Sequence, residues 1–112
     1  MTTNAPELDV GKMRAAAEPA SGLLRALANP DRLLVLCHLS QGERCVSEME
    51  EELGIQQPTL SQQLTVLRTQ ELVSTRRDGK RIYYSVSDPK ALAVLETLYR
   101  LFCAPRGKHR AN

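Results

Sequence analysis

The sequence predicts a single, mainly α-helical domain that carries one β-hairpin near its C-terminal end. Its 112 residues are the usual length of one domain. The composition is 42% hydrophobic and 25% charged, with no Trp and one Phe, which favours a core of Leu, Val and Ala on helices. Two segments rich in β-branched and aromatic residues flank Asp78-Gly79, the strongest short-range hairpin signal.

Apolar spacing and capping residues predict the first two helices. Apolar side chains recur with helical period over residues 13–27. Pro19 and Gly22 both disfavour a helix interior, so we expect this helix to begin late or to be kinked. Asn29, followed by a proline, is a typical N-cap and opens a second helix over residues 30–40.

Two further helices follow, separated by a tight turn. Residues 46–53 predict a short helix, which Gly54 ends because glycine tolerates a positive φ. Pro58 then stands at the first position of a fourth helix that runs to about Gln70. Its inward residues follow the i, i+4, i+7 rule and are Leu60, Leu64 and Leu67. The outer face carries Ser61, Gln62, Thr65 and Arg68.

The hairpin and a last helix complete the predicted order of helix, helix, helix, helix, strand, strand, helix. Residues 73–77 and 80–86 predict two antiparallel strands joined by the Asp78-Gly79 turn. Asp88-Pro89 is an N-cap followed by a first-turn proline, and the apolar stripe that follows predicts a helix ending near Cys103.

Charge is divided unevenly along the chain. Residues 1–56 hold five Lys/Arg against nine Asp/Glu, a net charge of −4, whereas residues 57–112 hold ten against four, a net charge of +6. The second half is therefore where a polyanion would dock. We expect residues 11–103 to form the domain, with flexible ends at 1–10 and, in a basic tail, at 104–112.

Two short helices joined by a tight turn, followed by a basic hairpin, are the order of a winged helix-turn-helix. Only the first two turns of the fourth helix would enter a major groove, where Gln can pair with adenine and Ser with bases or phosphates. The hairpin cations would contact the backbone or minor groove. The alternative is an ordinary amphipathic helix beside a hairpin kept soluble by charge. The charge asymmetry favours double-stranded DNA as the partner.

Three segments resemble the ArsR/SmtB family of dimeric bacterial winged-helix repressors. They are ALANPDRLLVLCHL (26–39), QQPTLSQQLTVLR (56–68) and RRDGKRIYYSV (76–86). The resemblance covers about residues 20–103 and keeps the family's order and spacing. It implies a homodimer formed through the first and last helices, which binds operator DNA.

The resemblance also implies that Gln57, Ser61 and Gln62 stand at DNA-contacting positions. Many members have Ser and His where this chain has Pro58 and Gln62, so the operator sequence does not follow from the family. The full set of predicted DNA-binding residues is Gln57, Pro58, Thr59, Ser61, Gln62, Gln63, Thr65, Arg68, Arg76, Arg77, Lys80 and Arg81.

Members of the family usually lose DNA affinity when they bind a metal or when a thiol is modified. The CxC metal motif falls on GERCVSEME, where only Cys45 is present and Ser47 replaces its partner. The zinc pattern of the last helix survives only as Asp88. Neither metal site is complete, so we predict no metal and no other cofactor. We interpret Cys45 as exposed and dispensable.

Cys37 and Cys103 resemble the thiol pair of the persulfide-sensing branch, typified by BigR, SqrR and HlyU. The resemblance implies that reactive sulfur species join the two thiols through one or more sulfur atoms and so release DNA. The alternative for Cys37 is a small buried hydrophobe. Both thiols lie towards helix C-termini, where the dipole disfavours thiolate. The cations that could activate them are Arg32, His38, Arg100 and Arg106.

Two other functional classes are a metalloregulator and an enzyme. A metalloregulator could bind a thiophilic metal or As(III) through Cys37, Cys45 and Cys103, because soft ions favour thiolates. An enzyme is disfavoured, since the chain has no Gly-rich phosphate loop, no HExxH, no CxxC and two histidines. No apolar run reaches the roughly 18 residues that span a bilayer, and no secretory signal is visible, so we expect a cytoplasmic protein with no membrane partner.

Overall fold

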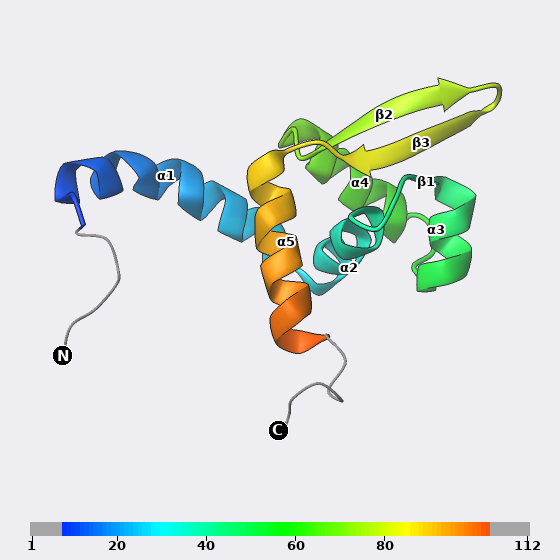
Figure 1. Cartoon of the computed structure of the whole chain (residues 1–112). Helices are drawn as coiled ribbons and strands as arrows, with labels where there is room; N and C mark the ends of the chain where they lie inside the picture. The colour runs from blue at the N-terminus through cyan, green and yellow to red at the C-terminus, as the bar shows by residue number, and fades with distance from the viewer. Residues whose placement is uncertain (1–7, 104–112) are drawn as a thin grey trace.

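The computed structural model describes residues 8–103, which form a helical body from which one helix and a β-hairpin project (Figure 1). The elements are α1 (Val10–Leu27), α2 (Pro30–Leu39), β1 (Arg44–Cys45), α3 (Val46–Leu53), α4 (Thr59–Thr69), β2 (Val73–Asp78), β3 (Arg81–Val86) and α5 (Pro89–Phe102). The predicted winged helix-turn-helix order is confirmed, with one additional strand. The predicted basic tail, 104–112, and most of the predicted N-terminal segment lie outside the described residues.

The first helix differs from the prediction, because α1 begins at Val10 and runs for 18 residues through Pro19 and Gly22. Its start is fixed by Asp9, whose carboxylate accepts a hydrogen bond from the backbone N–H of Lys12 at 3.1 Å. Pro19 donates no backbone hydrogen bond, but this part of the helix is exposed, so water can satisfy the carbonyl left over. The expected late start is therefore wrong.

Caps define the other helices much as predicted. Asn29 caps α2 by accepting from the Arg32 N–H at 3.0 Å, and Asp88 caps α5 by accepting from the Lys90 N–H at 2.8 Å. Gly54 ends α3 in the left-handed conformation, with a φ of 73°. Pro58 is the N-cap of α4 rather than its first helical residue, since its carbonyl accepts the helical bond from the Gln62 N–H at 3.0 Å.

The core lies between α2, α3, α4, α5 and the base of the hairpin. Leu36, Met49 and Leu60 are completely buried, and each such side chain stabilises the fold by about 1.5–3 kcal/mol. The cluster comprises Ala26, Leu27, Val35, Leu36, Leu39, Met49, Ile55, Leu60, Leu64, Leu67, Leu72, Val73, Tyr84, Ala91 and Leu95. Among residues 8–103, no helix is long and apolar enough to cross a membrane.

The hairpin belongs to a three-stranded antiparallel sheet with the order β1-β3-β2. Across β2 and β3, Arg76 faces Tyr83 and Asp78 faces Arg81. β1 was not predicted, because two residues are too few to show a strand period. Cys45 of β1 pairs with Tyr83 and is 3% exposed, so the expectation that Cys45 is exposed is wrong.

Candidate nucleic-acid interface and sensor thiols

The recognition-helix candidate α4 presents its predicted polar face to solvent. Its leucines pack into the core, against α2 and β2, and this fixes which side chains point outward. Six of the predicted DNA-binding residues at this helix are exposed, namely Gln57, Pro58, Ser61, Gln62, Thr65 and Arg68. Thr59 is half-buried.

The start of α4 is fixed by a side-chain cap. The Gln57 Oε1 accepts hydrogen bonds from the Ser61 N–H, at 3.2 Å, and from the Ser61 hydroxyl. One turn later the Thr65 hydroxyl donates to the Ser61 carbonyl at 2.9 Å. Within residues 8–103 the Gln62 amide makes no side-chain hydrogen bond, so its donor and acceptor are both open to a base edge.

Gln63 does not belong to this outer face. It is half-buried, and its Oε1 accepts a hydrogen bond from the Arg32 Nη1 of α2 at 3.3 Å. The periodicity explains this position, because Gln63 follows Leu60 by three residues and precedes Leu67 by four, which places it beside the inward stripe. Its carbonyl oxygen is thus engaged inside the protein.

Arg76 is occupied in the same way by its own protein. Its Nη2 and Nε donate to the two carboxylate oxygens of Glu43 at 2.6 and 3.1 Å. The guanidinium also lies over the Tyr83 ring, 4.8 Å from its centroid. The hydrogen bond to Arg76 lowers the pKa of Glu43, so this carboxylate stays ionised as a partner. Arg76 was predicted to be a free DNA contact, but its charge is compensated here.

The other hairpin cations are exposed around the tip. Arg77 donates to the Gly79 carbonyl at 3.3 Å, and Lys80 follows within the same turn. A hydrogen bond with the Tyr83 phenol raises the pKa of the Arg81 guanidinium, which stays charged. Arg77, Lys80 and Arg81 therefore form the cationic wing tip in the described chain.

Cys37 and Cys103 lie on two helices that contact each other, α2 and the end of α5, although 65 residues of sequence lie between them. Cys37 is half-buried towards the end of α2, and Cys103 is the exposed C-cap of α5. Both are free thiols. Burial raises the pKa of the Cys37 thiol, and the negative charge of a Cys103 thiolate raises it further. The contact between α2 and α5 thus brings the two thiols into the same part of the domain, where their charges interact.

The cations proposed to activate these thiols have other partners. Arg32 donates to two backbone carbonyls and to Gln63, and the His38 Nε2 lies 2.6 Å from Glu52 Oε1. Arg100 donates to the Thr97 hydroxyl at 3.5 Å. Arg106 lies outside the described residues. Among residues 8–103, no cation therefore acts to lower the pKa of Cys37.

Cys45 is not part of this thiol pair. Its sulfur lies 3.3 Å from the Ser47 hydroxyl, and its backbone N–H donates to Glu48 Oε1 at 2.9 Å. Cys45 thus serves as the N-cap of α3. In the described chain, no three or more His, Cys, Asp or Glu residues are placed to hold one metal ion.

Comparison with known proteins decides the family. The family described as "Bacterial regulatory protein, arsR family" matches residues 29–75. The biofilm growth-associated repressor of Agrobacterium fabrum is 46% identical over 113 residues, covering 94% of this chain and 97% of the relative. The chain belongs to the ArsR family. As in the rest of that family, the expected function is regulation of transcription and not catalysis, and the homologues support this.

Solved ArsR-family structures share the architecture. The transcriptional repressor BigR from Xylella fastidiosa matches with a TM-score of 0.81 and 43% identity, covering 88% of this chain and all of that one. Reduced HlyU from Vibrio cholerae matches with a TM-score of 0.80 and 38% identity, covering 83% and 98%. The predicted resemblance to the BigR and HlyU branch is thereby confirmed.

Proposed function

We propose that this ArsR-family protein is a homodimeric repressor that binds operator DNA and releases it when reactive sulfur species join Cys37 to Cys103. The observation that carries the proposal is that two contacting helices each carry a free thiol, one half-buried in α2 and one exposed at the end of α5. The proposed DNA contacts lie on one feature, the exposed face of α4 with the adjacent hairpin.

DNA contact divides between the two parts of this feature. The open amide of Gln62 and the exposed side chains near it read base edges in a major groove. The wing tip contacts phosphates or the minor groove and gives the complex its salt dependence. It consists of Arg77, Lys80 and Arg81. Arg76 contributes less, because Glu43 already holds it.

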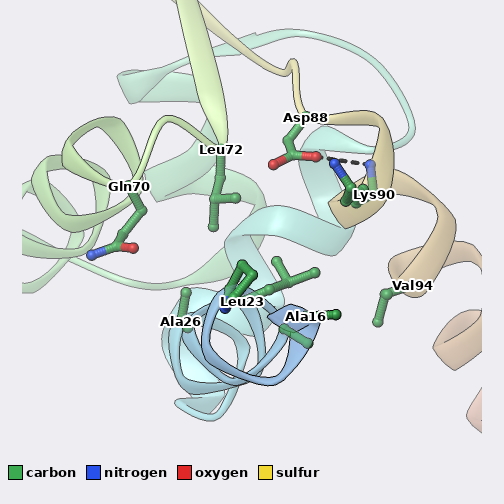
Figure 2. Close-up of a pocket in the computed structure, with 11 residues that line it drawn as sticks. Ala16, Leu23, Ala26, Gln70, Leu72, Asp88, Lys90 and Val94 are labelled. Carbon is green, nitrogen blue, oxygen red and sulfur yellow. Dashed lines mark hydrogen bonds between the residues drawn. The ribbon is translucent and has the colours of Figure 1, made fainter. Parts of the chain in front are cut away.

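The dimer forms through α1 and α5, which carry most of the large apolar side chains left exposed. Figure 1 shows α1 projecting from the helical body. A cleft of about 630 Å³ lies between α1 and the start of α5, and Leu23, Leu72 and Val94 line it (Figure 2). A second copy would cover these surfaces. The exposed apolar residues on the two helices and their ends are Leu8, Val10, Met13, Leu24, Tyr99, Leu101 and Phe102.

The sulfur chemistry follows from the exposure of the thiols. The exposed Cys103 thiolate attacks the outer sulfur of a low-molecular-weight persulfide, and the thiol of that compound leaves. Cys37 then attacks the sulfur bonded to the Cys103 carbon, hydrogen sulfide leaves, and a disulfide forms. If each cysteine first takes one sulfur, the two persulfides condense to a trisulfide and release one hydrogen sulfide. The trisulfide is longer than a disulfide, so it suits a wider separation between the two cysteines.

A covalent link between Cys37 and Cys103 would tie α2 to the end of α5, at the proposed dimer seam. It would thereby favour one relative placement of the two recognition helices. A coupling of about 1–3 kcal/mol is usual between two sites, and it corresponds to a 5- to 150-fold fall in operator affinity.

Cys37→Ser and Cys103→Ser are each expected to abolish this release while keeping DNA binding. Operator affinity is measured by fluorescence anisotropy with a fragment of the adjacent promoter, before and after glutathione persulfide, and intact mass reports the added sulfur. Cys45→Ser is the matched control, because serine is a good N-cap for α3, and it should respond like the wild type. Full release from Cys37→Ser would overturn the proposal. Release by As(III) under anaerobic, persulfide-free conditions would indicate a metalloregulator.

Glu43→Gln is expected to strengthen DNA binding by freeing Arg76 for a phosphate. One further phosphate contact steepens the dependence of log K on log salt by about 0.9. The control is Glu96→Gln, which removes the same charge from an exposed position on α5. Affinity is titrated at several salt concentrations. Equal slopes in the two variants would show that Arg76 does not reach DNA.

A further inference from the structure

A single guanidinium joins three helices of the domain. Arg32, in the first turn of α2, donates from Nε to the Ala26 carbonyl at 2.7 Å and from Nη2 to the Arg25 carbonyl at 3.1 Å. Both carbonyls belong to the last turn of α1. The Nη1 of the same side chain donates to Gln63 Oε1 on α4 at 3.3 Å.

The bonds to α1 act as a C-terminal cap. The last carbonyls of a helix have no partner within the helix, and the helix dipole makes that end attractive to a cation. Arg32 satisfies the Ala26 carbonyl from a neighbouring helix and gives the Arg25 carbonyl a second donor beside the Ala28 N–H, which lies at 3.2 Å. These hydrogen bonds therefore constrain the orientation of α1 relative to the start of α2.

The bond to α4 adds a second constraint on the rotation of that helix about its axis, beside the packing of its leucines. Gln63 lies beside the inward stripe, whereas its neighbour Gln62 is exposed on the outer face. Successive residues of an α-helix are about 100° apart, so holding Gln63 towards α2 fixes where Gln62 points. The donor of this bond is charged, which strengthens a hydrogen bond relative to one between neutral groups.

We propose that Arg32 is a positioning residue that passes the arrangement of α1 and α2 to the recognition helix through Gln63. This inference rests on the proposed function, because α4 must bind DNA for its rotation to matter. Arg32 stands on the helix that carries Cys37 and holds the end of the helix proposed to form the dimer seam. Gln63 is then a transmitting side chain and not a base contact.

The test is a double-mutant cycle on Arg32 and Gln63. Gln63→Met keeps the length of the side chain but removes the acceptor, and Arg32→Lys keeps the charge but cannot span both helices. Each is expected to lower operator affinity about five- to tenfold, the effect of losing one ordinary hydrogen bond between α2 and α4. The double variant should be no weaker than Arg32→Lys alone, since both changes break one connection. Urea unfolding identifies any variant that has simply lost stability.

Two further measurements separate positioning from direct contact. The ratio of operator affinity before and after persulfide treatment is expected to fall by about fivefold or more in Gln63→Met, as expected for loss of a coupling element. Gln62→Met is the matched control and should keep this ratio while losing preference at particular base pairs. A base-specific loss in Gln63→Met, or an unchanged ratio, would overturn the inference. Failure of the wild type to bind operator would instead overturn the proposed function.

Discussion

Replacing Leu101 and Phe102 together by Glu is expected to produce a monomer that has lost most of its operator affinity. These side chains are 71% and 81% exposed at the end of α5, where nothing within residues 8–103 covers them. In a twofold-symmetric dimer each substitution acts twice. Four carboxylates would then stand in an apolar seam, where unpaired charge is costly. Losing the second half-site removes an avidity of about 10² to 10⁴.

Sedimentation velocity gives the oligomeric state of this variant, and anisotropy gives its operator affinity. The matched control is Leu101→Met with Phe102→Leu, which keeps the surface apolar and should keep the dimer. Circular dichroism should show that the charged variant retains its helices, because neither residue belongs to the buried core. A charged variant that remains dimeric would place the seam elsewhere. A monomer with wild-type operator affinity would show that one recognition helix is enough.

The boundaries of the elements could be predicted where a local side chain fixes the backbone. Asn29 and Asp88 each accept a hydrogen bond from an N–H two or three residues later. Gly54 adopts the positive φ that ends α3. These interactions lie within one turn of the chain, so the sequence contains all the information they need. The same holds for the inward leucines of α4, which need only the helical period.

The charge pairing and hydrogen bonding of the site could not be predicted in the same way, because the paired side chains are remote from each other in sequence. Glu43 and Arg76 are 33 residues apart, and Arg32 and Gln63 are 31 apart. A basic residue in a hairpin predicts affinity for an anion, but it does not show whether a carboxylate of the same protein has already taken that role. Two of the twelve predicted DNA-binding side chains, Gln63 and Arg76, bond to residues that lie more than 30 positions away in sequence.

Cys45 illustrates the same limit for burial. It was expected to be exposed, and the surrounding segment GERCVSEME shows no pattern that predicts its burial. The burial comes from β3, which pairs with β1 in a sheet that only the folded chain assembles. By contrast, the pairing of Cys37 with Cys103 was implied by family resemblance alone, since the two helices that carry them meet only in the tertiary structure.

Leu36→Ala is expected to reduce the free energy of unfolding by about 2–5 kcal/mol, the usual cost of a large-to-small change in a core. Leu36 is 0% exposed on α2, which contacts α1, α3, α4 and α5. A domain of this size is stable by only about 5–15 kcal/mol, so the variant is expected to be close to unfolding. The cavity would also open beside Cys37, the next residue, and expose the thiol that the proposed sensor keeps half-buried.

Leu34→Ala on the same helix is the control, because Leu34 is 44% exposed and its loss should cost less than about 1 kcal/mol. Urea unfolding is followed at one fixed protein concentration, since dimerisation makes apparent stability depend on concentration. Equal losses of unfolding free energy in the two variants would mean that the buried core around α2 does not dominate stability. A large loss in Leu36→Ala alone would show that α2 is the element on which the recognition helix, the projecting helix and the sensor thiol all depend.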